Sequence, residues 1–129
     1  MKPQQEKITS FSKLHCWQEG HKLVLLVFQI TRVFPREQQF VLVSQMTRAA
    51  ISITSNVAEG FSRGSFKEKL QFYYIAQGSL TELQNQLLIS RDVGYISKIQ
   101  FMKLAEQSIV VHKLLSGLIR YAKMSIKNI

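Results

Sequence analysis

Hydrophobic residues recur along the chain at intervals of three and four, and this spacing predicts helices throughout. Breaks in the pattern fall at Phe34-Pro35, at Gly60 and at Gly94. The residue before a proline avoids the α region, and a glycine commonly follows the last turn of a helix. No segment alternates with period two for long enough to form a strand. We therefore expect four helices, over about residues 16–33, 36–59, 66–93 and 98–123, with flexible ends at 1–10 and 125–129.

Two capping boxes mark the starts of the third and fourth predicted helices. Ser65 and Glu68 fit the S-x-x-E pattern, and Ser97 and Gln100 fit the related S-x-x-Q pattern. In such a box each side chain accepts a hydrogen bond from the backbone N–H of the other residue. Four long helices with short connections favour a single all-α domain over residues 1–129, an antiparallel up-down-up-down four-helix bundle.

The first predicted helix is apolar on nearly every side. Val24 and Val27 lie on one side at helical spacing, whereas Leu25 and Val33 occupy other sides. A helix of this kind is normally covered by more than one neighbour, so we expect it to be buried.

The second predicted helix carries a polar seam beside its apolar face. We call the polar seam the five residues Gln45, Arg48, Ser52, Asn56 and Glu59. A solvated face is one interpretation. A subunit interface is the other, because amides, a serine and single charges suit directional contacts, and the small residues alongside would let another helix approach. In the third helix, Gly78 and Ser79 weaken an isolated helix, so we expect close packing there.

These features resemble one known family. In order they are Trp17, Phe34-Pro35, the motif Q-x-x-RAA-x-SI-x-x-N-x-AEG at 45–60, IA-x-GSL-x-EL at 75–83 and GYI at 94–96. Over about residues 11–122 the chain resembles the four-helix-bundle proteins encoded within intervening sequences of bacterial 23S ribosomal RNA genes. The resemblance implies a ring-like homopentamer. Related accessory proteins of diversity-generating retroelements share this fold, and form basic pentamers that bind nucleic acid and the retroelement's reverse transcriptase.

The chain departs from the family pattern at two positions of this motif. Thr47 stands where the family often has a second arginine before Arg48, and Val57 stands where it often has isoleucine. Neither change threatens the fold, but the first puts any role of an arginine pair in doubt.

Charge points to a polyanionic partner. The formal net charge is +9, and residues 97–129 carry six basic groups against one acidic group. A surplus of this size favours nucleic acid, and less so an anionic membrane surface. Four basic residues of the fourth helix lie opposite its apolar stripe and form the first candidate site: Lys98, Lys113, Arg120 and Lys123. An ordinary solvated helix face is the alternative interpretation of this basic stripe.

A second candidate site lies between the second and third predicted helices. Arg63, Lys67 and Lys69 surround the start of the third helix, where free backbone donors favour anions. The terminal residues Lys2, Lys7 and Lys127 could add further contacts. Since no base-reading motif is present, we expect recognition by shape or charge, and the sequence does not distinguish RNA from DNA.

Catalytic and membrane functions find little support in the sequence. The chain has no Glu-x-x-His motif of the kind that builds a di-metal site in a helix bundle, and we expect no metal or cofactor. The single Cys16 excludes an intrachain disulfide and points weakly to a reducing compartment. The longest apolar run, residues 23–28, is far shorter than the roughly 20 residues of a membrane span. We expect a cytoplasmic protein that is not an enzyme.

Two functions follow as hypotheses. The first is a non-catalytic, basic, homopentameric scaffold that binds RNA or DNA. The alternative is an adaptor that docks a retroelement reverse transcriptase, with nucleic-acid contact secondary.

Overall fold

The computed structural model describes residues 10–127, and this part of the chain is helical without any strand. A short 3-10 turn, η1 (Phe11–Lys13), precedes four long helices. The helices are α2 (His15–Thr31), α3 (Ser44–Ser62), α4 (Phe66–Asp92) and α5 (Lys98–Lys127). The predicted all-helical class with four long helices is confirmed. Most of the predicted flexible ends, residues 1–9 and 128–129, lie outside the described part, whereas residues 125–127 continue α5.

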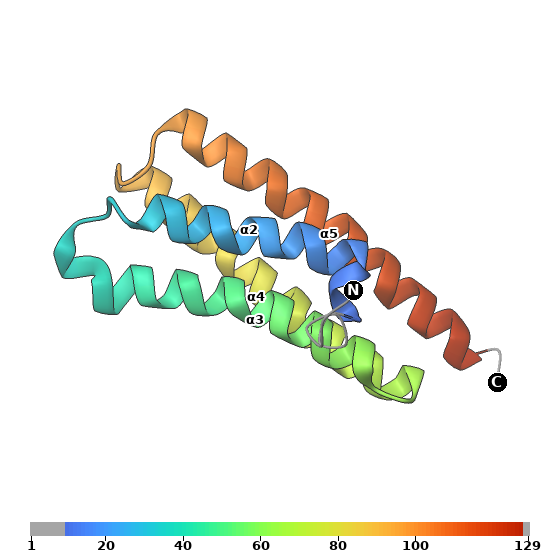
Figure 1. Cartoon of the computed structure of the whole chain (residues 1–129). Coiled ribbons are helices and arrows are strands. Elements are labelled where there is room, and N and C mark those ends of the chain that lie inside the picture. Colours follow the sequence, from blue (N-terminus) through green and yellow to red (C-terminus); the bar gives the residue numbers. More distant parts are fainter. Residues whose placement is uncertain (1–9, 128–129) are drawn as a thin grey trace, which may run out of the picture.

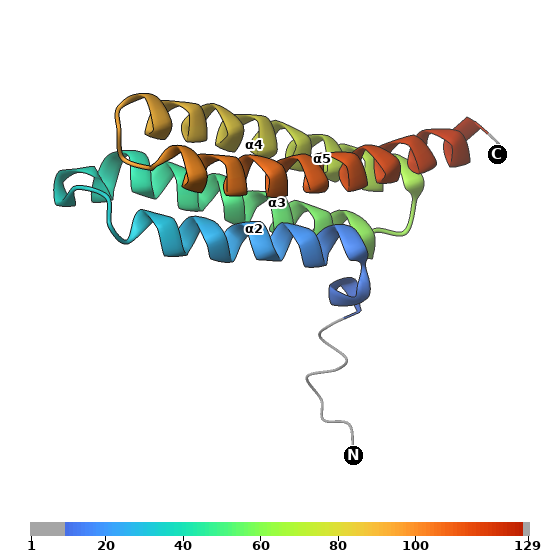
Figure 2. The ribbon, with the colours of Figure 1, turned by 90° about the horizontal axis from the view of Figure 1, so that it is seen from above.

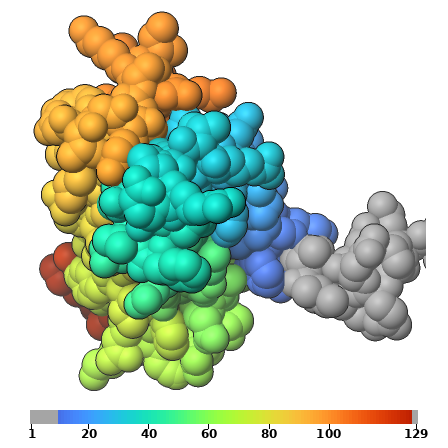
Figure 3. Space-filling model, turned by 90° about the vertical axis from the view of Figure 1, so that its left-hand side faces the viewer, coloured from blue at the N-terminus to red at the C-terminus, as the bar shows by residue number. Residues whose placement is uncertain are grey.

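The four helices lie side by side, and consecutive helices run in opposite directions (Figures 1 and 2). Each helix packs against its neighbours in sequence, and α5 closes the bundle by packing against α2. We call the end that holds the α2–α3 and α4–α5 connections the connection end; Figure 3 views the molecule from this side. The opposite end, which holds η1 and the α3–α4 connection at residues 63–65, is called the corner end.

Buried apolar side chains from all four helices form the core. One cluster includes Leu23, Met46 and Leu83, and a second, smaller cluster includes Cys16 and Tyr73. Toward the corner end, Leu14, Trp17 and Leu70 pack against the second cluster. Because every helix contributes an apolar stripe, burial of these stripes is the main stabilising term of the bundle.

The predicted capping box is complete at the start of α5, whereas at the start of α4 the serine half of the box is formed. The Ser97 Oγ accepts from the Gln100 N–H at 3.1 Å, and the Gln100 Oε1 accepts from the Ser97 N–H at 2.8 Å. The Ser65 Oγ accepts from the Glu68 N–H at 3.2 Å.

Gly94 ends α4, as predicted. Its φ of 83° lies in the left-handed region, and the N–H of Tyr95 donates to the Ser90 carbonyl at 2.9 Å. The N–H of Gly94 itself donates to the Arg91 carbonyl at 3.1 Å, which completes a Schellman motif.

Gly60 does not stop the second helix, contrary to the sequence-based prediction. The helix continues to Ser62, and Gly60 is buried within its last turns. A Cβ atom at Gly60 would lie only 2.7 Å from the Tyr73 Cε1 atom. The glycine therefore serves close packing of α3 against α4 rather than chain reversal.

The beginning of the second helix and the end of the fourth also differ from expectation. Residues Arg36–Gln38 form a 3-10 turn, η2, and Gln39–Val43 form a π-helical segment, η3, so regular α-helix starts only at Ser44. A hydrophobic pattern with a period of 3.6 residues does not reveal a π-helical segment, because its hydrogen bonds join residues five apart instead of four. At the other end of the chain, α5 continues to Lys127 instead of ending near residue 123.

The prediction that more than one neighbour covers the first helix is confirmed, because α3 and α5 both pack against α2. The burial is incomplete, however, since Leu25 is 56% exposed and Phe28 is 42% exposed. Helix α2 thus keeps an apolar strip that no described residue covers.

Candidate nucleic-acid interface

The outer face of α5 carries the first predicted basic site. The four basic residues of this predicted site are exposed, and none of them forms an ion pair within the described part of the chain: Lys98, Lys113, Arg120 and Lys123. The Lys123 Nζ lies 5.6 Å from the centroid of the Tyr74 ring, a cation–π contact between α5 and α4. The face is not purely polar, because Met102 and Ile109 are exposed on the same helix. Its cations are therefore free to meet an anionic partner.

The second predicted basic site is partly engaged by the fold itself. The Arg63 Nη2 lies 2.9 Å from the Glu59 Oε2, and the guanidinium lies over the Phe72 ring. The Lys69 Nζ donates to the carbonyl of Phe61 at 2.6 Å, where it satisfies a free acceptor at the end of α3. Lys67 is exposed and has no ion pair with a described residue. Two of the three corner cations thus hold the corner, and Lys67 remains available.

The polar seam divides into an internal part and an exposed part. The Ser52 and Ser79 Oγ atoms lie 2.8 Å apart across the α3–α4 contact, and the Asn56 Nδ2 donates to the Ser52 carbonyl at 2.8 Å. Gln45 and Arg48 are exposed and have no hydrogen-bond partner within residues 10–127. The middle of the seam therefore joins two helices of one chain, and only its first two residues are free for another subunit.

The small residues beside the seam already have a neighbour in α2. A Cβ atom at Gly20 would lie 3.0 Å from the Thr54 Cγ2 atom, so α2 and α3 approach closely there. The small residues were expected to let a helix of another subunit come close. On this side of α3, the helix that comes close is α2 of the same chain. At Gly78 the opposite holds, because an added Cβ would meet no atom within 4 Å. The predicted close packing at Gly78 is therefore not made by any residue of the part of the chain that the structure describes.

A pocket at the corner end was not predicted from the sequence. Its volume is about 260 Å³, and residues from all four helices or their flanks line it: Leu14, Phe61, Phe66, Lys69, Tyr73, Leu118, Tyr121 and Ala122. Tyr121 is 64% exposed at its rim. In the sequence, the trace of this pocket is a set of aromatic residues that stand next to a lysine or an arginine. Those pairs are scattered along the chain, and only the fold brings them together.

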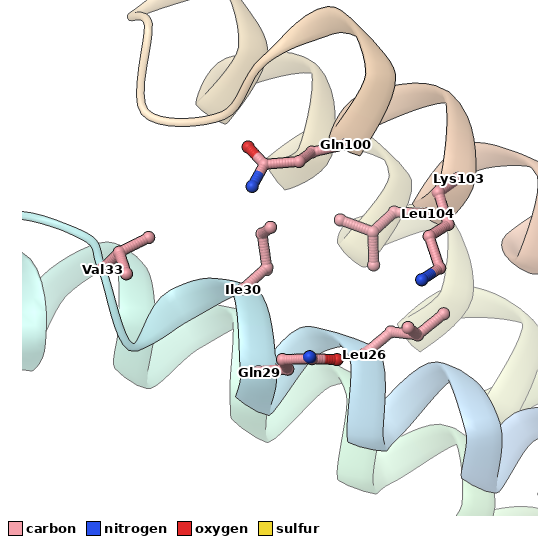
Figure 4. A pocket seen from close by; sticks show the side chains of 7 residues that line it. All are labelled: Leu26, Gln29, Ile30, Val33, Gln100, Lys103 and Leu104. Atoms are coloured by element: carbon pink, nitrogen blue, oxygen red, sulfur yellow. The ribbon is translucent and has the colours of Figure 1, made fainter.

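A second pocket lies between α2 and α5 and holds about 220 Å³ (Figure 4). Figure 4 shows Ile30 of α2 and Leu104 of α5 reaching toward one another between the two helices. Of its polar residues, Gln100 already accepts the Ser97 N–H. The lining contains no carboxylate, histidine or thiol, and Lys103 is its one titratable side chain.

Near the middle of the bundle, a polar link joins α2 to α5. The Gln107 Nε2 donates to the Glu19 carbonyl at 2.8 Å, and the Lys22 Nζ lies 2.8 Å from the Glu19 Oε2. Hydrogen bonds from Lys22 and then from Gln107 lower the pKa of Glu19. These groups satisfy each other, so they form a structural contact rather than a reactive site.

Catalytic chemistry finds no assembled site in the described residues. No group of three or more His, Cys, Asp or Glu side chains there could hold a metal ion. Burial raises the pKa of the Cys16 thiol to about 12, which keeps it protonated and poorly nucleophilic. None of the described helices has the length and apolar character needed to cross a bilayer.

Comparisons with known proteins agree with this fold. A family model described as 23S rRNA-intervening sequence protein matches residues 12–117. Among solved structures, the chain is similar to a protein of unknown function from the S23 ribosomal protein family of Bacteroides thetaiotaomicron, with 22% identity and a TM-score of 0.75. The alignment covers 81% of this chain and 97% of that one, and at this identity it supports the fold alone. No curated protein matches the sequence.

Proposed function

Because the chain belongs to the 23S rRNA-intervening sequence protein family, we propose that it is a non-catalytic nucleic-acid-binding protein that works as a homo-oligomeric ring. The observation that carries the proposal is the outer face of α5, where four exposed cations have no ion pair with a described residue. The net charge of +9 has the same sign. A symmetric ring would repeat this face in every subunit, so modest patches would add to a strong potential toward phosphates.

Charge reversal on α5 tests the nucleic-acid part. In the variant Lys113→Glu/Arg120→Glu/Lys123→Glu, we expect RNA affinity at low salt to fall roughly 100-fold or more, and the slope of affinity against salt to flatten. The matched control is Arg32→Glu/Arg36→Glu, which is compared with the double variant Arg120→Glu/Lys123→Glu so that both change the net charge by the same amount at exposed positions. Fluorescence anisotropy with labelled RNA measures both. Equal losses in the two variants would exclude α5 as the binding face.

The oligomeric part draws on surfaces that the single chain leaves uncovered. Leu25 and Phe28 of α2 are exposed, and Arg48 of α3 is exposed beside Ile51, which is also exposed. Apolar strips and a free arginine of this kind suit a subunit contact. Size-exclusion chromatography with light scattering should give about five times the 14.9 kDa chain, roughly 75 kDa.

Arg48 is the seam residue to change in that experiment, since Ser52, Asn56 and Glu59 have partners within the chain. Arg48→Ala should lower the mass of the assembly without lowering the helicity of the chain. Arg32→Ala, at the exposed C-cap of α2, is the control. A monomeric wild-type protein would remove the ring from the proposal.

The second candidate function, an adaptor for a reverse transcriptase, draws on the connection end. Phe40 is 95% exposed there, and Val33 and Ile99 are also exposed. Large apolar side chains in water favour a protein partner. Co-purification with a retroelement reverse transcriptase tests this function, with the Phe40→Ser/Ile99→Ser variant compared with the wild type. Capture that is equal for both would argue against docking at this end.

A further inference from the structure

Four of the eight residues that line the pocket at the corner end are aromatic. Phe61 from the end of α3, Phe66 and Tyr73 from α4, and Tyr121 from α5 all line it. Phe66 and Tyr121 meet edge to face with centroids 5.6 Å apart. Since Tyr121 and Phe61 are both exposed, two flat rings border the opening and are accessible from solvent.

The pocket is smaller than a site for a drug-sized ligand. Such sites typically hold about 300–1,000 Å³, whereas this pocket holds about 260 Å³. Its size therefore suits one flat ring system rather than a larger molecule. Aromatic walls bind flat rings by stacking, which tolerates any base because every base has a π face.

One polar group of the lining is open to a ligand. Tyr73 as a residue is only 3% exposed, and its hydroxyl forms no hydrogen bond with a described residue, but the hydroxyl oxygen itself keeps contact with solvent. A ligand with a polar edge, such as a nucleobase, could accept a hydrogen bond from this hydroxyl in place of water.

Cations flank the pocket in a way that suits phosphates. Four exposed basic residues are sequence neighbours of lining residues, and none forms an ion pair within residues 10–127: Lys13, Lys67, Arg120 and Lys123. Of the acidic residues near this corner, Glu59 is paired with Arg63, which leaves Glu68 as the unpaired one. An apolar peptide would gain nothing from these positive charges.

We infer that the corner-end pocket receives an unpaired base of a single-stranded nucleic acid, while the flanking cations contact the adjacent phosphates. The inference rests on the proposed nucleic-acid function and adds the class of ligand. In a duplex the bases are stacked on each other and cannot enter the pocket. The protein should therefore bind a single strand more tightly than the charge of its phosphates alone explains.

Three labelled ligands separate the base from the phosphates. They are a uridine strand of about 12 nucleotides, an abasic strand of the same length, and a duplex of the same length. Each is titrated by fluorescence anisotropy against the full-length wild type, Tyr121→Ala, Tyr121→Phe and Phe40→Ala. Phe40 is the matched control, because it is an exposed aromatic residue at the connection end. Since Tyr121 is largely exposed, its variants should fold, which circular dichroism verifies.

The wild type should prefer the uridine strand to the abasic strand. Tyr121→Ala should lower affinity for the uridine strand by roughly 10-fold and leave the abasic strand unchanged. Tyr121→Phe should retain the preference because it keeps the ring, and Phe40→Ala should change nothing.

Other outcomes overturn the inference and can be told apart. If all three ligands bind and Tyr121→Ala has no effect, or weakens the abasic strand equally, the pocket does not hold a base and the proposed function stands. If no ligand binds at low salt, the proposed function fails as well. If Tyr121→Ala weakens binding to anionic lipid vesicles alone, the pocket is a lipid site.

Discussion

The two ends of the bundle are closed by different devices and present different surfaces. At the connection end, a Schellman turn at Gly94 and a reciprocal capping box hold the chain, and Phe34 packs against Tyr95 across the two connections. At the corner end, Gly60 lets Tyr73 pack against α3, and the Lys69 ammonium satisfies carbonyls at the end of that helix. Local backbone rules thus close one end, and side-chain packing between helices closes the other.

The two ends also differ in the side chains that they expose. The connection end exposes three large apolar side chains, Val33, Phe40 and Ile99, among cations that form no ion pair with a described residue, Arg32, Arg36 and Lys98. The corner end exposes Tyr121 beside unpaired Arg120 and Lys123. An apolar surface favours a protein partner, whereas rings among free cations favour a polyanion. Under the two functions proposed above, a protein partner and a polyanion would therefore meet different ends of the bundle.

The largest expected effect concerns the close packing at the corner end. Gly60→Val would place side-chain atoms inside the space that the buried Tyr73 ring occupies. We expect the free energy of unfolding to fall by about 3 kcal/mol, measured by urea denaturation. Gly64→Val is the control, because an added Cβ there meets no atom within 4 Å, and it should change stability by less than about 0.5 kcal/mol. Similar values for both variants would mean that packing does not hold this corner.

The next effect is a weakness of the corner end in alkali. Burial raises the pKa of Cys16 from 9.0 in the unfolded reference to about 12, so the folded state favours the protonated thiol. This contribution is complete below pH 9 and is lost as the pH rises toward 12. Each unit is worth about 1.4 kcal/mol, so stability should fall by on the order of 2 kcal/mol near pH 10.5.

Urea denaturation across this range should show a shallower dependence on pH for Cys16→Ala than for the wild type. The native thiol should also resist alkylation at about pH 8, because little thiolate is present. Rapid alkylation of the folded protein, or identical pH profiles for the two proteins, would contradict the assigned burial.

A smaller loss is expected at the connection end. Gly94 has a φ of 83°, and an alanine there carries a Cβ that disfavours the left-handed region. Gly94→Ala should lower the free energy of unfolding by about 1 kcal/mol. Gly94→Asn should lower it less, since asparagine tolerates this conformation better. If asparagine and alanine cost the same, the backbone conformation is not what holds this end.

The smallest effect has the opposite sign and lies midway between the two ends. Gly78 is exposed in the interior of α4, and nothing lies within 4 Å of an added Cβ. Gly78→Ala should raise the free energy of unfolding by about 0.8 kcal/mol through better helix propensity. Thermal unfolding and light scattering on the same sample measure stability and mass together. A lower mass for this variant than for the wild type would reveal that another subunit approaches closely at Gly78.

The sequence by itself determined the helices and the devices that act within a few residues. The capping pairs Ser65–Glu68 and Ser97–Gln100 and the stop at Gly94 were readable because their hydrogen bonds join near neighbours in the chain. The RAA and AEG motifs identified the family for the same reason, as the order of residues along the chain is all that a motif requires. The π-helical segment at Gln39–Val43 escaped, because its period differs from that of an α-helix.

Only the tertiary structure decided which partner each helix face meets. The spacing of the polar seam is visible in the sequence. Spacing alone does not show that Ser52 meets Ser79 of α4 while Arg48 remains free. Gly60 was interpreted as a stop because its neighbour, Tyr73, lies in another helix. The corner pocket likewise joins Phe61, Phe66 and Tyr121. The rotation and offset of one helix against the next are set by interlocking side chains from distant segments, and a single-helix pattern does not contain them.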